Sequence, residues 1–154
     1  MGNSLSVLSF SGEHRWLSNF WLAPVEFTAF GERFVIPTTE HLFQMSKLEH
    51  IDASNFKKKY LFEEALNLDS PGKAKRFGKM ISDLNMKSWN AAKDEAMKRV
   101  LQAKYTQHPD LMDKLLGLKD YYIEEGNTWG DRYWGVDDGT GLNKLGNIYM
   151  GTAR

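Results

Sequence analysis

The chain has 154 residues, the size of one ordinary domain and enough to bury a core without disulfides or metals. Its 20 basic and 20 acidic side chains cancel, which argues against a protein that holds duplex nucleic acid by neutralising many phosphates. It contains no cysteine, so a disulfide framework, a thiolate nucleophile and a thiolate zinc site are excluded.

The composition predicts a soluble protein of the cytoplasm. Hydrophobic residues make up 42% and charged residues 26% of the sequence, as in ordinary globular domains. The segment Met1 to Phe10 has no basic region followed by an apolar run, so we expect no signal peptide. No apolar stretch is long enough to span a bilayer. We expect a single domain over residues 1–154.

The first third of the chain predicts short strands joined by turns. Weak alternation of apolar and polar residues predicts strands at Ser6–Phe10, Val25–Phe27 and Arg33–Ile36. A turn at Phe30–Glu32 separates the second from the third.

Helices are predicted over most of the remainder. Pro37 ends the third strand, and Thr38 or Thr39 is a good N-cap for a helix that runs to about His50. Further helices are expected at 53–67, from 69–71 onward, at 86–106 and at 109–118, then a short strand at 121–124 and a last helix after Asn143 or Gly146. The apolar positions of the 53–67 helix are Phe56, Tyr60, Leu61 and Leu66. Strands first and helices later predict a helix-rich α+β domain.

Glu40 is the first candidate for chemistry. It lies in the first turn of the helix after Pro37, where the helix dipole favours a negative charge. An ionised carboxylate there suits a base or a hydroxyl acceptor better than a proton donor. Glu40, Gln44 and Lys47 share one helix face, flanked by Phe43. The alternative is a solvated polar stripe with an i,i+4 hydrogen bond.

The segment 127–141 is the second candidate, because it contains two Trp-Gly pairs and three aspartates. Glycine lets backbone approach a ligand closely. Tryptophan offers a flat face for stacking on a base, and aspartate can accept from ribose hydroxyls or a water. The alternative is a long packed loop whose tryptophans cap the core.

Other chemistries are absent from the pattern. There is no Walker sequence, no nucleophile elbow, and no metal-binding spacing among the four histidines, so we expect neither a metal site nor a cofactor. Gly139, Gly141 and Gly146 have the wrong spacing for a dinucleotide fingerprint. Carboxylates, tryptophans, amides and glycines remain, a set that serves chemistry through an oxocarbenium-like state.

Several motifs in this order resemble the NADAR family, the YbiA-like N-glycosidases. They are Ser18-Asn19-Phe20, Thr39-Glu40-His41-x-Phe43-Gln44-x-x-Lys47, Trp89, Tyr133-Trp134-Gly135 and Asn143-x-Leu145-Gly146. The resemblance extends from about Leu8 to Arg154.

The resemblance implies a helix-rich α+β domain that hydrolyses N-glycosidic bonds. Members of the family act on early phosphoribosylamino intermediates of riboflavin synthesis, or remove ADP-ribose from modified bases such as guanine. By motif, Glu40 matches the essential glutamate, Trp89 and Trp134 the two functional tryptophans, Lys47 the motif lysine and Asn19 the N-terminal asparagine.

The sequence departs from the family pattern after Trp134. An aspartate commonly follows the Trp-Gly pair closely, whereas here Val136 precedes Asp137. Either Asp137 or Asp131 therefore supplies the second carboxylate, and we favour Asp131 for contact with ribose or water. The other expected substrate-binding residues are Arg15, Ser18, Gly139 and Asn143.

Two other functions stay open at this point. The chain could bind ADP-ribose or a related nucleotide without cutting it, or it could be an interaction protein that uses exposed aromatic side chains. The expected ligand is a small nucleotide-like molecule, free or attached to nucleic acid. The basic runs at 57–59 and 73–76 are interpreted as ordinary solvated helix faces.

Overall fold

The computed structural model describes residues 5–153. Residues 1–4 and 154, which belong to the predicted domain 1–154, lie outside the described residues. The chain forms two compact units, one from Asn19 to Gln107 and one that combines the residues up to Ser18 with those from His108 onward. No helix in the described part of the chain is long and apolar enough to cross a membrane.

The Asn19–Gln107 unit contains one antiparallel hairpin. Strands β2 (Val25–Ala29) and β3 (Glu32–Ile36) pair from Val25 opposite Ile36 to Ala29 opposite Glu32. The two turn residues, Phe30 and Gly31, have φ of 53° and 73°, as a tight hairpin turn requires. A positive φ strains a phenylalanine, and the Phe30 ring packs edge-on against Phe62 at 5.5 Å between centroids.

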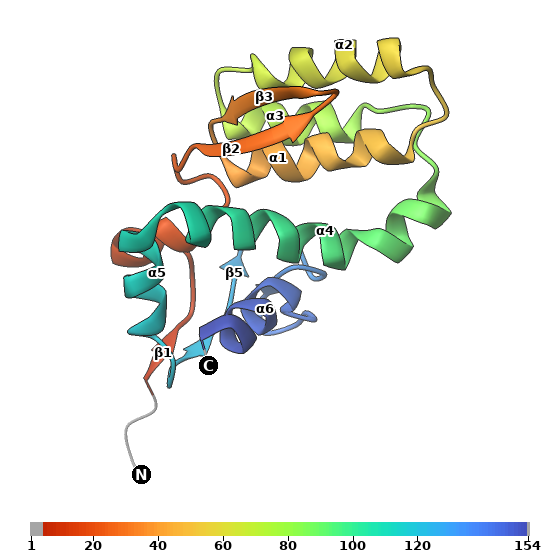
Figure 1. The fold of residues 1–154 in the computed structure, drawn as a ribbon. Coiled ribbons are helices and arrows are strands. Elements are labelled where there is room, and N and C mark those ends of the chain that lie inside the picture. Colours follow the sequence, from red (N-terminus) through yellow and green to blue (C-terminus); the bar gives the residue numbers. More distant parts are fainter. Residues whose placement is uncertain (1–4, 154) are drawn as a thin grey trace. The chain divides into compact units, whose positions relative to one another are not determined.

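Five helical segments follow in this unit, largely where the sequence predicts them. They are α1 (Thr39–Ser46), the 3-10 helix η2 (Lys47–His50), α2 (Asn55–Leu66), α3 (Pro71–Lys79) and α4 (Met86–Gln107). Thr38, Ser54 and Ser70 each cap a helix by accepting a hydrogen bond from the backbone N–H three residues on. Helix α1 contacts α2, α3 and α4 (Figure 1).

Helix α2 buries a different face from the one its apolar sequence suggests. Phe56 and Tyr60 are 85% and 65% exposed, whereas Phe62 and Ala65 are buried. Phe62 is held by the rings of three hairpin residues, Phe27, Phe30 and Phe34. The hairpin therefore selects the buried face of α2.

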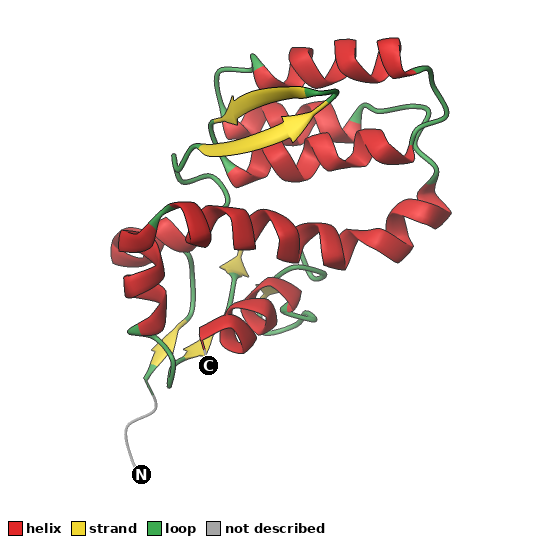
Figure 2. Ribbon diagram, in the orientation of Figure 1, coloured by secondary structure: helices red, strands yellow, loops and turns green. Residues whose placement is uncertain are grey.

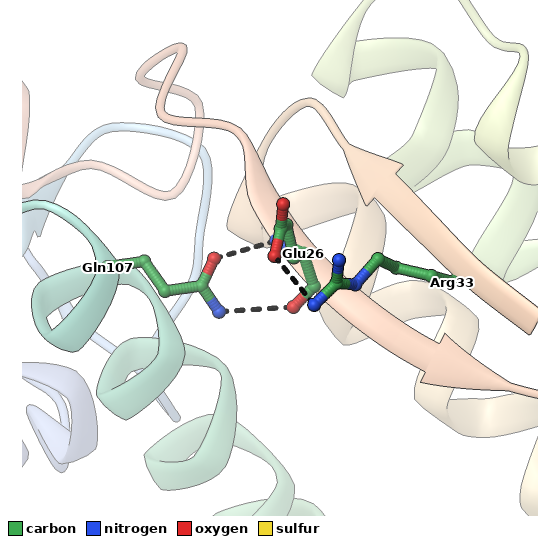
Figure 3. A network of polar contacts seen from close by, with 3 residues as sticks. All are labelled: Glu26, Arg33 and Gln107. Atoms are coloured by element: carbon green, nitrogen blue, oxygen red, sulfur yellow. Dashed lines mark hydrogen bonds and ion pairs between the residues drawn. The ribbon is translucent and has the colours of Figure 1, made fainter.

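Polar contacts join the end of α4 to the edge of the hairpin (Figure 3). The Gln107 side chain accepts from Glu26 N at 2.7 Å and donates to Glu26 O at 3.0 Å. Arg33 lies 3.6 Å from the Glu26 carboxylate. Gln107 thus satisfies backbone groups that the edge strand β2 would otherwise leave to solvent.

The second unit has little regular sheet (Figure 2). Strand β1 (Ser6–Val7) runs parallel to β4 (Tyr122–Ile123), and β5 (Gly126–Asn127) parallel to β6 (Val136–Asp137). Its helices are η1 (Gly12–Leu17), α5 (Pro109–Leu116) and α6 (Lys144–Ala153). The Tyr149 hydroxyl of α6 donates to Leu17 O at 2.6 Å.

The helix-rich α+β class is confirmed, with three differences in detail. Strand β1 is shorter than the predicted Ser6–Phe10. The segment η1 and the pair β5–β6 were not predicted, because two-residue strands and a 3-10 turn carry no periodic pattern.

Lys104 is an unusual member of the core. Its side chain on α4 has an exposed fraction of 0%, and its Nζ lies 5.3 Å from the ring centroid of Tyr105. Burial disfavours the charged ammonium and lowers the pKa of Lys104 from 10.5 to about 7.

We expect the stability of the protein to rise with pH between about 7 and 10.5 because of Lys104. In that range the unfolded chain binds a proton that the folded chain does not, so the free energy of unfolding increases by up to about 1.4 kcal/mol per pH unit. In Lys104→Met this contribution disappears. Urea unfolding of parent and variant at pH 7, 8 and 9 measures the difference in slope.

The exposed Lys87 on the same helix provides the matched control, since Lys87→Met should keep the slope of the parent. Equal slopes in the parent and Lys104→Met would contradict a lowered pKa.

Candidate active site

The first turn of α1 is held from outside by Asn19. Glu40 N donates to Asn19 O at 3.1 Å, and the Thr39 hydroxyl donates to Asn19 Oδ1 at 2.8 Å. The Asn19 amide nitrogen lies 3.3 Å from Met97 Sδ on α4. Asn19 therefore satisfies backbone and side-chain donors at the helix start and fixes the position of Glu40.

The Glu40 carboxylate is buried, with an exposed fraction of 8%. Gln44 Nε2, one turn along α1, donates to Glu40 Oε2 at 2.6 Å. Both side chains are shielded from water, so the solvated polar stripe considered from the sequence is wrong, although its i,i+4 hydrogen bond is present. A carboxylate buried in this way needs hydrogen-bond donors, and Gln44 supplies one of them.

Gln44 also carries an unsatisfied group. Its Oε1 is buried and has no hydrogen-bond partner in the described part of the chain. A buried acceptor without a donor costs stability, and a donor on a ligand or a water would satisfy it.

Gly78 on α3 makes room for Gln44. A Cβ at position 78 would lie 2.6 Å from Gln44 Cδ and still closer to Oε1. No side chain fits at this position while Gln44 keeps its bond to Glu40.

Lys47 lies beside the same carboxylate. Its Nζ is 5.7 Å from the centroid of the Trp89 ring. Burial lowers the pKa of Lys47, the charge of Glu40 opposes this, and the neighbouring ammonium groups of Lys79 and Lys93 lower it further. Lys47, Lys79 and Lys93 therefore share one region near Glu40 and form a lysine cluster. A bound anion would stabilise this arrangement.

Trp89 is enclosed by protein. Its exposed fraction is 5%, and its ring packs against Phe43 at 5.3 Å and His50 at 5.6 Å. These contacts, together with Lys47, cover much of the indole. Trp89 therefore supports the lysine and the end of α1.

His41 has a structural role. Its Nε2 lies 2.9 Å from Leu68 O and must donate to that carbonyl. In the neutral ring Nδ1 then accepts from the Thr38 hydroxyl, 2.7 Å away. Both nitrogens are thus engaged in holding the N-terminus of α1.

In the second unit, two aspartates organise the loop around Trp134. Asp131 Oδ1 accepts from Tyr133 N at 3.1 Å and from Trp134 N at 2.9 Å. Asp137 Oδ2 accepts from Gly130 N at 2.7 Å. Each aspartate spends one oxygen on the backbone of its own loop, and both are half-buried.

Asparagine side chains complete the order of this loop. Asn127 donates to Asp131 O at 2.9 Å and accepts from Asp131 N at 3.1 Å. Asn143 accepts from Glu125 N at 3.0 Å and donates to Ile123 O at 2.9 Å. Asn143 is buried, and these bonds give it a structural role.

Trp134 forms an aromatic pair with the preceding Tyr133. The rings of Tyr133 and Trp134 meet edge-on at 4.8 Å between centroids, and Lys144 Nζ lies 5.5 Å from the Tyr133 ring. Trp134 is half-buried. Gly139, at φ 75°, is exposed in a turn with open space around it.

Two glycines, Gly135 in this loop and Gly146 in the following helix α6, allow close packing. A Cβ at Gly135 would meet the carbonyl oxygen of Glu125, and one at Gly146 would meet that of Ile123. Close packing therefore requires glycine at these two positions. Trp129 is 63% exposed and Trp134 half-buried, so the tryptophans do not both cap the core as the packed-loop alternative expects.

The sequence-predicted residues divide between the two units. Asn19, Glu40, Lys47 and Trp89 lie together in the Asn19–Gln107 unit. The others belong to the second unit: Arg15 in η1, Ser18 directly after it, and Asp131, Trp134, Asp137, Gly139 and Asn143 in or beside the loop around Trp134.

The sequence places Gln44 on the face of Glu40, and its i,i+4 spacing is the signal that marks it as a partner of the carboxylate. Nothing in the sequence marked Gly78. Among residues 5–153 no group of three or more His, Asp or Glu side chains could hold a metal ion.

Comparison with known proteins identifies the family. Residues 9–153 match the model of the NADAR domain. The chain belongs to the NADAR domain family. N-glycosidase YbiA of Escherichia coli is 33% identical over 147 residues, which cover 95% of this chain and 84% of that protein. The NMR structure of E. coli YbiA superposes with a TM-score of 0.76 at 32% identity, covering 99% of this chain and 84% of that one.

Two riboflavin biosynthesis proteins are also similar to this NADAR domain. The chloroplastic protein PYRR of Zea mays is 30% identical over 125 residues, covering 78% of this chain and 20% of that protein. The Vibrio vulnificus protein VVA0006 is 28% identical over 138 residues, covering 89% and 34%. This chain therefore spans only a part of each. The resemblance predicted from the motifs is confirmed.

We expect Gly78→Ala to destabilise the protein by about 1–3 kcal/mol, the usual cost of overpacking a core, although alanine is the better helix former. Gln44 must move, and its bond to Glu40 is lost. Chemical denaturation measures the change. The control is Gly72→Ala on the same helix, where the new Cβ meets only ordinary contact with Ser70 at 3.9 Å.

Gly72→Ala should leave stability unchanged or slightly raised. If the two variants are equally stable, Gln44 is not confined by Gly78.

Proposed function

We propose that this NADAR domain is an N-glycosidase that hydrolyses the bond between C1′ of a phosphorylated ribose and a nitrogen atom. The observation that carries the proposal is the buried Glu40 carboxylate at the start of α1, held by Asn19 and Gln44 beside the lysine cluster. Similarity to N-glycosidase YbiA supports the class of reaction.

The reaction breaks the C1′–N bond and forms a C1′–O bond to water. Positive charge develops on C1′ and the ring oxygen in the transition state. The leaving nitrogen keeps the bonding electrons and gains a proton, and the water loses one. Glu40 accepts a hydrogen bond from a ribose hydroxyl or from the attacking water, and its negative charge stabilises the developing cation.

Asn19 and Gln44 act as positioning residues. Each fixes one part of Glu40: Asn19 O holds its backbone and Gln44 Nε2 holds Oε2. A carboxylate fixed before substrate arrives needs no reorganisation during the reaction, which is the main source of electrostatic catalysis.

The lysine cluster is suited to the phosphate. Lys47 is charged at neutral pH only at some cost, because burial and the nearby Lys79 and Lys93 lower its pKa. A bound phosphate dianion would reverse this effect and stabilise all three ammonium groups. The Trp89 ring, whose centroid lies 5.7 Å from Lys47 Nζ, helps to hold that ammonium group in place.

The roles of the Trp134 loop rest on the family's motif. Trp134 stacks on the leaving base, and an aspartate of its loop contacts ribose or water. Asp131 is our first choice, with Asp137 as its rival.

Two substrates contain the required bond. The names of PYRR and VVA0006 favour a phosphoribosylamino-pyrimidine intermediate of riboflavin synthesis. ADP-ribosylated guanine is the second candidate. Release of ribose 5-phosphate from the first, or of ADP-ribose from the second, identifies the substrate. Saturable binding of both with no product would instead select a non-catalytic nucleotide-binding module.

We expect Glu40→Gln to lower kcat/KM by about 100-fold or more, the usual contribution of a positioned acid–base group. The substituted amide keeps the shape of the side chain and can still accept from Gln44, so the melting temperature should stay close to that of the parent. Product release by chromatography measures the rate. Glu64→Gln, an exposed carboxylate on α2, is the control and should react like the parent.

A folded Glu40→Gln that hydrolyses the substrate as fast as the parent would remove Glu40 from the mechanism.

We expect Asp131→Asn to lower kcat/KM by about 10-fold or more, because one charged contact in the transition state is lost. Asp137→Asn should lower kcat/KM less. Both carboxylates accept backbone hydrogen bonds, and the asparagine oxygen preserves these in each variant. The comparison therefore isolates the charge. The opposite order of rates would assign the second carboxylate to Asp137.

A further inference from the structure

A cavity with a volume of about 550 Å³ lies within the Asn19–Gln107 unit. This volume is that of a small-molecule binding site. Its walls come from the hairpin, from α1 and η2, from α2 and from α4. The lining residues are Phe27, Thr28, Ala29, Phe30, Leu42, Met45, Ser46, Leu48, Glu49, Asn55, Lys58, Phe62, Ala96, Arg99, Val100 and Ala103.

The cavity is separate from the Glu40 site. Helix α1 contributes Leu42, Met45 and Ser46 to its wall. At about 100° of rotation per residue, these positions lie on the opposite half of the helix from Glu40 and Gln44. A molecule in the cavity therefore does not compete for the carboxylate.

The body of the cavity is apolar. Phe27, Phe30 and Phe62 supply aromatic surfaces, and the last is buried at the centre of the cluster. On α4, Ala96 and Ala103 are two helical turns apart and leave the space that larger side chains would fill. Such a wall favours a flat or branched apolar group.

Two cationic side chains line the cavity, and neither is paired with a carboxylate. Within the described residues neither Arg99 nor Lys58 forms an ion pair. The neighbours of Lys58 differ in this respect, because Lys57 pairs with Asp83 and Lys59 with Glu32. The exposed Glu49 is the one acidic lining residue, so positive charge predominates there.

We propose that this cavity binds a small amphiphilic anion, with its apolar body against the phenylalanines and its anionic group held by the lining cations Arg99 and Lys58. Mainly apolar walls with a few charged groups are typical of sites for such ligands. The proposal does not depend on the proposed N-glycosidase activity, because the cavity shares no lining residue with the Glu40 site.

Anilinonaphthalene sulfonate is a suitable probe, since it joins two aromatic groups to one sulfonate and fluoresces in apolar surroundings. The neutral N-phenyl-naphthylamine has the same rings without the charge. We expect saturable binding of the sulfonate to the folded protein at one site, about tenfold or more tighter than the neutral probe, because two charge-assisted contacts are lost.

Two sets of variants locate the site. Ala103→Trp fills the cavity and should abolish the fluorescence rise, whereas Ala91→Trp, exposed on the same helix, should not. Arg99→Gln with Lys58→Gln should weaken sulfonate binding to the level of the neutral probe. Loss of Lys57 and Lys87, on the same two helices but outside the cavity, should have no such effect.

The charge variants are at or near the surface, so they decide the matter even if Ala103→Trp does not fold. The proposal fails if the sulfonate shows no saturable binding, if both probes bind equally, or if the Arg99 and Lys58 variant binds like the parent. It also fails if a folded Ala103→Trp binds the probe unchanged, or if Lys47→Gln abolishes binding, since the probe would then occupy the Glu40 region.

Discussion

The hydrogen bond from Gln44 to Glu40 explains much of the Asn19–Gln107 unit. A carboxylate taken out of water needs a partner, and Gln44 supplies one from the next turn of the helix. Gln44 in turn needs space, which explains the glycine at position 78 of α3. The carboxylate must also begin the helix, where the dipole favours it, and Asn19 holds that first turn from outside. One buried charge thus accounts for residues on three separate segments.

Helix α1 separates two chemical environments. One face carries the hydrogen-bonded pair Glu40 and Gln44, and the lysines of η2, α3 and α4 lie near it. The other face borders an apolar cavity bounded by the hairpin and by α2 and α4. Because a helix turns its side chains to opposite sides every two residues or so, eight residues suffice to serve both. The hairpin also decides which face of α2 is buried. The same hairpin rings pack on Phe62 and line the cavity.

The second unit is organised by different means. Its strands are only two residues long, so few of its backbone groups are satisfied by a sheet. Side chains replace that ladder: Asn127, Asp131 and Asn143 pair with the backbone of the loop around Trp134. The aspartates expected to serve chemistry therefore also maintain the loop, which is why charge-only substitutions separate the two roles. Two glycines of this loop, Gly135 and Gly141, allow carbonyl groups to approach closely.

The local features of this protein follow directly from its amino-acid sequence. Helix caps at Thr38 and Ser70, the tight turn before β3 and the motif around Glu40 depend on neighbours a few residues away, so their physical causes lie within the pattern. Features that depend on distant partners arise only when the whole chain packs. Packing buries Lys104 and Trp89, leaves Phe56 exposed and places Gly78 against Gln44. No periodicity predicts these outcomes, because burial and close packing are set by residues from elsewhere in the chain, and the same helix pattern is compatible with more than one buried face.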